Sequence, residues 1–253
     1  MSVLNEIVAN KKKEVEAMKK NAPLSRFADQ LKKANGSFRK AISKNKLCLI
    51  AEIKRSSPSQ KVISASSDIA KIAGIYSCHA DAISVLTDEK YFNGSLDDLD
   101  KVRSLTQLPI LRKEFIVDEY QIYQSRLHGA DAILLIVAAL SQEQLKRFLA
   151  IAASLGMDCL VEAHDKEELK TALDCGAQIV GINNRNLHTL KTDLDTTFEL
   201  ISGIPKGKII VSESGIQGNS DVAKLRGKVN AILVGTLLMR SSDMEKEITS
   251  LMK

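Results

Sequence analysis

Glu52 and Lys54 are the first residues whose types and spacing indicate chemistry. They follow the apolar residues 47–51 and are separated by Ile53. Side chains alternate between the two faces of a strand, so this carboxylate and this ammonium point the same way. Such a pair can accept and donate protons or bind an anionic substrate. A purely structural ion pair would leave the same pattern in the sequence.

Polar residues of the same kinds end four more apolar runs of the chain. The third, fifth, sixth and seventh runs end in these residues: Lys113, Glu162, Asn183 with Arg185, and Glu213 with Ser214. Burying an unpaired charge costs several kcal/mol, so five such run ends in one chain indicate a site of lysine and carboxylate chemistry. Arg112 and Glu114, one step from Lys113, are expected to face the surrounding helices and to be structural.

The elements that must position these residues are eight short apolar runs separated by longer amphipathic segments. The runs cover residues 49–53, 82–86, 109–113, 132–137, 158–163, 179–183, 208–214 and 231–235. Their starts are roughly 20–33 residues apart, which leaves room for a helix between successive strands. Near-continuous runs of Val, Ile and Leu are typical of strands buried on both faces, as in a parallel sheet.

Eight consecutive strand–helix units predict an α/β fold, a closed (β/α)8 TIM barrel. The alternative is an open doubly wound sheet, which is disfavoured because no GxGxxG motif follows any run. Residues 1–46 show helical patterns only, with a break at Pro23 and a second helix expected to start at Ser25. We expect residues 1–46 to form an N-terminal helical extension packed on a barrel of residues 47–253, in a single domain overall. In a barrel the C-terminal ends of the strands form the active site, so the polar run ends would meet there.

Two glycine-containing turns predict a phosphate site. Ser214 and Gly215 follow the seventh run, and Gly235 and Thr236 follow the eighth. Backbone amides in these two loops form the phosphate site that is common in barrels. A tight turn explains either glycine alone better, but the pair on neighbouring strands favours phosphate.

The composition excludes several classes of function. The chain has 253 residues, of which 44% are hydrophobic and 26% charged, as in an ordinary globular protein. Its net charge of +5 suits an anionic small molecule, whereas 4% aromatic residues and no tryptophan argue against nucleic acid. Isolated histidines and cysteines without CxxC spacing predict no metal and no cofactor. The longest apolar run, residues 133–140, is too short to span a membrane and no secretion signal is visible, so we expect a cytoplasmic protein.

Several of these segments resemble one enzyme family. The segments are IAEIKRSSPS, AISVLTDEKYFNGSLDDL, ILRKEFIVDEYQIYQSRLHGADAILLI, LVEAHD, GINNRNL, VSESGI and ILVGTLLM. They resemble indole-3-glycerol phosphate synthase, an enzyme of tryptophan biosynthesis, in the same order from about residue 3 to residue 240. The N-terminal LNEIVANKKKEV and SFRKAI resemble the family's helices before the barrel. The long segment around Lys113 is highly specific.

The resemblance implies a carboxy-lyase that converts 1-(2-carboxyphenylamino)-1-deoxyribulose 5-phosphate into indole-3-glycerol phosphate, carbon dioxide and water. It implies Lys113 as the general acid of ring closure and Glu162 as the general base. Lys54 would contact the substrate's anions and supply a second proton, with Glu52 orienting it. The sequence leaves open which lysine protonates at which step, since burial and neighbouring carboxylates shift the pKa of a lysine in opposite directions.

The resemblance also implies the substrate contacts. The ribulose hydroxyls and the anthranilate carboxylate would be positioned by Asn183, Arg185, Glu213 and Ser214. The phosphate would be held by Ser57, Gly215, Gly235 and Thr236. The aromatic ring would lie in an apolar slot that includes Phe115 and Leu134, although both also suit a core. The implied partner is thus a phosphorylated small molecule, bound by a monomer that contacts neither nucleic acid nor membrane.

One segment departs from the family pattern. The family usually continues SPS with Lys-Gly, whereas this chain has Gln60 and Lys61. The change removes a flexible glycine from the loop after the first strand, so loop motion and product release are expected to differ while the chemistry is retained.

Two other functions fit part of the pattern. Another phosphate-binding barrel, such as an isomerase of the same pathway, would explain the glycine turns but neither the segment around Lys113 nor the N-terminal helices. A non-catalytic barrel that only holds an anion would explain the basic mouth. A Lys113→Ala variant separates these, because binding would survive in a pure binder while turnover would collapse in the synthase.

Overall fold

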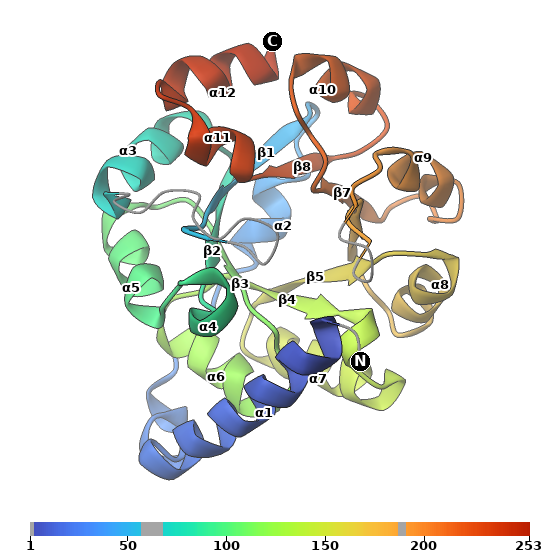
Figure 1. The fold of residues 1–253 in the computed structure, drawn as a ribbon. Coiled ribbons are helices and arrows are strands. Elements are labelled where there is room, and N and C mark those ends of the chain that lie inside the picture. The colour runs from blue at the N-terminus through green and yellow to red at the C-terminus, as the bar shows by residue number, and fades with distance from the viewer. Residues whose placement is uncertain (1–2, 57–67, 187–190) are drawn as a thin grey trace.

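The computed structural model describes residues 3–56, 68–186 and 191–253 and forms a closed barrel of parallel strands (Figure 1). Each strand pairs with the next along the chain, and β8 pairs with β1 to close the barrel. The strands are β1 Cys48–Ile53, β2 Ala82–Leu86, β3 Ile110–Lys113, β4 Ala132–Ile136, β5 Asp158–Ala163, β6 Ile179–Asn183, β7 Ile209–Glu213 and β8 Ala231–Val234. The predicted TIM barrel is confirmed, with each expected run forming a strand.

Helices surround the barrel and connect its strands (Figure 1). The α-helices are α1 Val3–Asn21, α2 Ser37–Ala41, α3 Ile69–His79, α4 Glu89–Phe92, α5 Leu96–Leu105, α6 Glu119–Leu127, α7 Gln142–Ser154, α8 Lys166–Asp174, α9 Asp195–Ile201, α10 Asn219–Leu225, α11 Thr236–Arg240 and α12 Met244–Met252. Three short 3-10 turns are η1 Leu24–Arg26, η2 Ala28–Gln30 and η3 Val137–Ala139. Ser141 and Asp165 cap α7 and α8 by accepting hydrogen bonds from backbone amides through their side chains.

Strand alternation divides the apolar residues into two cores. On β1, Leu49, Ala51 and Ile53 face the helices and belong to the outer core. Cys48 and Ile50 belong to the inner core, inside the barrel. The same alternation directs Glu52 inward, two residues beyond Ile50, which places its side chain above the inner core.

Helix α2 contributes to the inner core. Its Phe38, and Ile42 directly after it, are fully buried among the residues that fill the barrel interior. The interior is therefore packed rather than hollow, and the space left for a ligand lies at the carboxyl ends of the strands.

The segment after Pro23 differs from the expected helix. It forms the two 3-10 turns η1 and η2, and Ser25 lies inside η1 instead of capping a helix. Phe27 packs edge-on against Tyr120 of α6, with ring centroids 5.8 Å apart. The Ala34 amide donates to the Leu155 carbonyl after α7. These tertiary contacts hold the segment against the barrel, and they outweigh its weak local helix preference.

The outward-facing residues next to Lys113 form a buried polar network. Arg112 is 1% exposed and donates hydrogen bonds to Thr87, Gln124 and Ser125 at 3.0–3.1 Å. Glu114 is 3% exposed and accepts from Thr87 at 2.8 Å. Arg112 is directed toward the helices, as expected. Glu114 contacts Lys11 of α1 but also lines the cavity at the mouth of the barrel.

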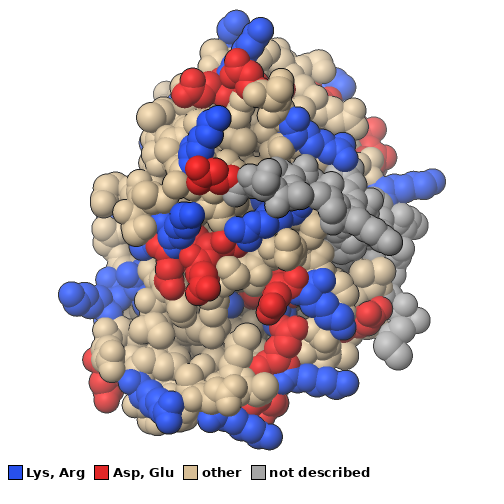
Figure 2. All heavy atoms as spheres, turned by 60° about the vertical axis from the view of Figure 1, so that its left-hand side comes forward, with Lys and Arg blue, Asp and Glu red and all other residues tan. Residues whose placement is uncertain are grey.

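Basic and acidic side chains are interspersed over the face drawn in Figure 2. The surplus of positive charge is thus not gathered into one basic surface over the described residues of this face. Within the described ranges no helix is both long and apolar enough to cross a membrane.

Candidate functional site

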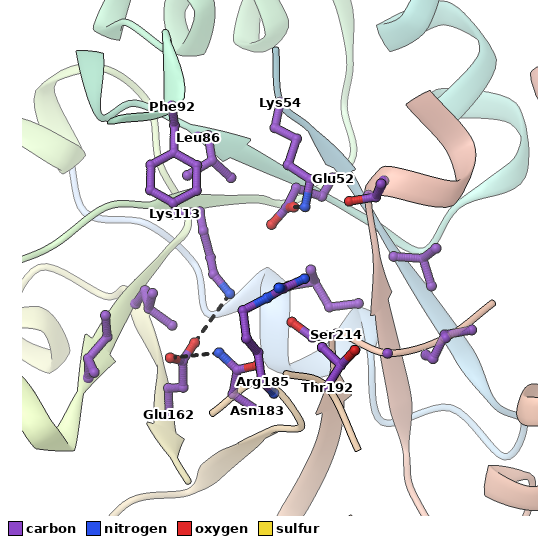
Figure 3. Close-up of a pocket in the computed structure, with 18 of the residues that line it drawn as sticks. Glu52, Lys54, Leu86, Phe92, Lys113, Glu162, Asn183, Arg185, Thr192 and Ser214 are labelled. Atoms are coloured by element: carbon purple, nitrogen blue, oxygen red, sulfur yellow. Dashed lines mark hydrogen bonds and ion pairs between the residues drawn. The ribbon is translucent and has the colours of Figure 1, made fainter. Parts of the chain in front are cut away.

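A cavity of about 470 Å³ lies at the carboxyl ends of the strands (Figure 3). It brings together most of the residues that the sequence predicted, namely Glu52, Lys54, Lys113, Phe115, Leu134, Glu162, Asn183, Arg185, Ser214, Gly215, Gly235 and Thr236. Glu213 is 1% exposed and contacts Lys113 from below the cavity surface instead of lining it. Ser57, Gln60 and Lys61 lie outside the described residues.

The first strand supplies a lysine–carboxylate pair. Lys54 Nζ lies 2.7 Å from Glu52 Oε1, and the carboxylate is almost fully buried. Gly235, after the neighbouring strand β8, comes so close that a Cβ there would lie 2.5 Å from the same oxygen. Only glycine leaves room for this pair, which explains a glycine at this turn without excluding a role for its amide.

Lys113 lies among three carboxylates. Its ammonium donates a hydrogen bond to Glu213. It also lies 3.4 Å from Glu162 Oε2 (Figure 3). Burial by itself lowers the pKa of Lys113. The negative charges of Glu213, Glu162 and Glu52 raise it by more than burial lowers it, so the pKa of Lys113 lies above its usual value. Lys113 is therefore protonated at neutral pH and has a proton to donate.

Glu162 is held as an ionised carboxylate. Asn183 donates a hydrogen bond to its Oε1 at 3.1 Å. Burial raises the pKa of Glu162, but the Lys113 ammonium and the hydrogen bond and charge of His164 more than offset this, giving a pKa of about 2. A carboxylate that stays ionised next to a protonated lysine is the arrangement that a base and acid pair requires.

His164 is a site residue that was not among those predicted from the sequence. Its Nε2 lies 3.3 Å from Glu162 Oε1 and its Nδ1 lies 2.9 Å from Glu168 Oε2. Burial lowers the pKa of His164, but these two carboxylates raise it to about 10. The imidazole is therefore a cation at neutral pH. Its position two residues after Glu162 was the only signal in the sequence, because Glu168 comes from the first turn of α8.

Glu213 is less well compensated than Glu162. Its Oε1 is buried and has no hydrogen-bond partner among the described residues. Burial raises the pKa of Glu213, the Lys113 charge lowers it, and the nearby Glu162 raises it again, giving about 7. Among the described residues Glu162 has three polar partners and Glu213 has one, so the two carboxylates that share Lys113 differ in proton affinity.

The turn after β7 has an unusual backbone. Ser214 and Gly215 both have positive φ angles, 65° and 81°. Such a conformation is uncommon for serine and persists only where the surroundings enforce it. The buried Asn184 does so, donating through Nδ2 to the carbonyls of Glu213 and Ser214 at 3.0 Å each. Asn184 is a supporting residue that the sequence reading missed.

The opposite end of the cavity is apolar. The rings of Phe92 and Phe115 lie 6.0 Å apart, and both line the cavity with Leu134. Helix α1 adds further apolar residues that the sequence reading did not place here, namely Val3, Leu4 and Ile7. Their helical spacing predicted a buried face but could not say which part of the barrel it covers. The cavity can thus hold a molecule with an aromatic ring at one end and anionic groups at the other.

No cluster of three or more His, Cys, Asp or Glu side chains able to hold a metal ion occurs in the part of the chain that the structure describes. The polar groups that line the cavity are lysines, arginines, carboxylates, amides and hydroxyls. Such groups support proton transfer and anion binding.

Comparisons with known proteins agree with this arrangement. A family model described as indole-3-glycerol phosphate synthase matches residues 4–251. A protein of that name from Caldanaerobacter subterraneus subsp. tengcongensis is 46% identical over 243 residues, covering 95% of this chain and 94% of that protein. Another from Thermoanaerobacter pseudethanolicus is 44% identical over 254 residues, covering 99% and 97%. A third, from Dehalococcoides mccartyi, is 51% identical over 209 residues, 81% of each. The chain therefore belongs to the indole-3-glycerol phosphate synthase family, a family of lyases in tryptophan biosynthesis.

Proposed function

We propose that this chain converts 1-(2-carboxyphenylamino)-1-deoxyribulose 5-phosphate into indole-3-glycerol phosphate, carbon dioxide and water. The observation that carries the proposal is the protonated Lys113 beside the ionised Glu162, at 3.4 Å, between an aromatic slot and two glycine turns. That order of groups matches a substrate with an aromatic acid at one end and a phosphate at the other.

In the proposed ring closure Lys113 acts as the general acid. The ring carbon that bears the carboxylate attacks the ribulose carbonyl carbon, and Lys113 gives its proton to the carbonyl oxygen as the new carbon–carbon bond forms. The carboxylate then leaves as carbon dioxide, and its bonding electrons restore the aromatic ring. The neighbouring carboxylates of Glu213 and Glu162 keep Lys113 charged until the substrate arrives.

In the proposed dehydration Glu162 acts as the general base. The ring nitrogen's lone pair expels the hydroxyl that ring closure created, and Lys54 donates the proton with which it leaves as water. Glu162 removes the proton from the adjacent methylene carbon, which completes the indole. Glu52 orients Lys54 through the 2.7 Å contact.

Binding is proposed to use the two ends of the cavity separately. The phosphate lies at the turns of Gly215, Gly235 and Thr236, with Ser57 as a further contact. The ribulose hydroxyls and the carboxylate are held by Asn183, Arg185, Glu213 and Ser214, and the ring by Phe115 and Leu134. The protein is proposed to act as a monomer.

The test uses the absence of tryptophan from the chain, because indole emission can then come only from product. The purified protein mixed with the carboxyphenylamino-deoxyribulose phosphate should show growing indole fluorescence. Lys113→Ala should lower kcat by about 10²–10⁴-fold, the usual loss of a general acid, and should still bind the substrate. Lys170→Ala, at an exposed lysine of α8, is the matched control and should leave kcat unchanged.

Two outcomes would contradict the proposal. Absence of indole emission from the wild-type protein would rule out the synthase. Equal turnover by Lys113→Ala and wild type would remove Lys113 from the mechanism. Substrate binding without any turnover would instead favour a barrel that only holds an anion.

A further inference from the structure

Lys11, on the helix α1 outside the barrel, is a buried cation that the mechanism does not use. Its side chain is 3% exposed, although it belongs to the run Lys11, Lys12 and Lys13 that the sequence shows as a charged helix face. Its ammonium lies 2.7 Å from Glu14, 2.8 Å from Asp88 and 3.2 Å from Glu114. A lysine is almost never buried in this way unless it is paired, so these contacts need an explanation.

The two barrel carboxylates of this cluster each hold one wall of the aromatic slot. Asp88 caps α4 by accepting a hydrogen bond from the Tyr91 amide at 2.8 Å, and α4 ends in Phe92. Glu114 accepts from the Phe115 amide at 2.8 Å. Lys11 therefore links Asp88, which caps α4, to Glu114, which binds the backbone amide of Phe115.

Helix α1 itself supplies the third wall. Leu4 and Ile7 precede Lys11 by seven and four residues, which places all three on the same face of the helix. Both apolar residues line the cavity at the end that Phe92 and Phe115 also line. One ammonium thus connects three segments of the chain, each of which contributes apolar surface to the slot.

We propose that Lys11 is a positioning residue that assembles the aromatic end of the site from α1, α4 and the strand end at Phe115. The inference rests on the proposed function only in naming that end as the place of the substrate's aromatic ring.

Removing the charge of Lys11 would leave Asp88 and Glu114 buried and facing each other. The remaining cation that contacts Glu114 would be Arg112, whose Nη2 lies 3.5 Å away. Arg112 makes no ion pair with Asp88 among the described residues. Burial by itself lowers the pKa of Lys11, but Glu114 and Asp88 raise it above its usual value, so the cation persists at neutral pH. Without it the carboxylates would separate and move α4 and Phe115 apart.

The experiment compares Lys11→Met with Lys19→Met and uses one probe for each end of the site. Lys19 lies on the same helix and contacts Asp118 at 2.7 Å, but its side chain is 35% exposed. The probes are indole and inorganic phosphate, each titrated by calorimetry. Lys11→Met should weaken indole binding by about fivefold or more, the factor expected when an aromatic contact is lost, and leave phosphate affinity within about twofold. Lys19→Met should change neither affinity.

Turnover gives a second measurement. Lys11→Met should raise KM for the carboxyphenylamino-deoxyribulose phosphate by a similar factor and leave kcat within about threefold, because Lys113 and Glu162 are not displaced. Equal weakening of indole and phosphate, or no change in indole affinity, would overturn the proposal. If Lys11→Met does not fold, Asp88→Asn tests the same connection and must weaken indole alone.

The two proposals can fail separately. If the wild-type protein binds indole and phosphate but produces no indole emission from the substrate, the proposed function is wrong. The effect of Lys11→Met on indole affinity is measured without turnover, so it would still decide the role of Lys11.

Discussion

Lys113 on β3 donates a hydrogen bond to Glu213 on β7, 100 positions later in the sequence. In a closed barrel of eight strands in sequential order, these two strands lie on opposite sides. The lysine therefore reaches across the floor of the cavity, and its charge is shared between Glu213 and Glu162. The unequal environments of the two carboxylates divide them into one that stays ionised and one that binds a proton near neutral pH.

The raised pKa of Glu213 predicts a pH-dependent stability. The folded protein keeps this carboxyl protonated up to about pH 7, whereas its ordinary pKa is 4.5. Between these values the folded state binds more protons than the unfolded state, so the stability that Glu213 contributes falls as pH rises. The Glu213→Gln variant has no carboxyl group to titrate at this position, so it does not lose this stability as pH rises. Its free energy of unfolding relative to wild type should therefore increase from pH 5 to pH 8, by on the order of 2 kcal/mol.

Urea unfolding at several pH values measures this difference. Glu143→Gln, at an exposed position of α7, is the control and should follow the wild-type profile. Parallel profiles for Glu213→Gln and wild type would show that Glu213 does not take up a proton in the folded protein.

His164 predicts a change in the acidic limb of activity. The Lys113 ammonium and the imidazolium together lower the pKa of Glu162 to about 2, against the effect of burial. His164→Gln removes one of the two cations, so the pKa of Glu162 should rise by about one unit. The fall of kcat at low pH should then begin about one pH unit higher than in the wild-type protein. The measurement is the pH profile of kcat between about pH 2 and pH 6, where Glu162 takes up its proton.

His128→Gln is the matched histidine control, since His128 contacts Asp100 on the outside of the barrel. Its profile should coincide with that of wild type. A His164→Gln profile that also coincides would mean that Lys113 alone sets the charge of Glu162.

Arg112 predicts a large stability effect. It is fully buried and donates to Thr87, Gln124 and Ser125. Arg112→Met leaves these acceptors and Glu114 without their donor, and should lower the free energy of unfolding by about 3–5 kcal/mol. Arg147→Met, at a 65% exposed arginine that contacts Glu119, should cost less than about 1 kcal/mol. Chemical denaturation compares the two, and equal losses would contradict the structural role of Arg112.

Gly181 predicts a steric effect on Glu213. A Cβ at this position on β6 would lie 2.1 Å from Glu213 Oε1. Gly181→Ala must therefore displace the carboxylate and disturb its bond to Lys113, with a loss of about 1–3 kcal/mol in stability and a lower kcat.

Gly74→Ala in α3 is the matched control. Its added Cβ would meet no described atom within 4 Å. Because alanine favours a helix over glycine, this variant should be more stable by about 0.5–1 kcal/mol and fully active. Full activity of Gly181→Ala would show that Glu213 can shift without consequence for Lys113.

The sequence by itself determined the barrel and the inner face of each strand. Alternation is a local property: once Ile50 faces the interior, Glu52 must do so as well, and Arg112 must face the helices if Lys113 faces the cavity. The resemblance of whole segments then predicted the family, which the comparisons confirm. These results needed no knowledge of how distant parts of the chain meet.

The tertiary structure decided which charges compensate one another. Lys11 belongs to a run of three lysines and His164 is an isolated histidine, so nothing local in the sequence marks either residue as buried. The structure buries both against carboxylates from other elements. The 3-10 turns after Pro23 likewise follow from contacts with α6 and α7. The physical reason is that a buried charge is stabilised by the opposite charges and hydrogen-bonding groups within about 4 Å of it. Which groups these are depends on how the closed barrel brings distant segments together, and the periodicity of the local sequence does not contain that information.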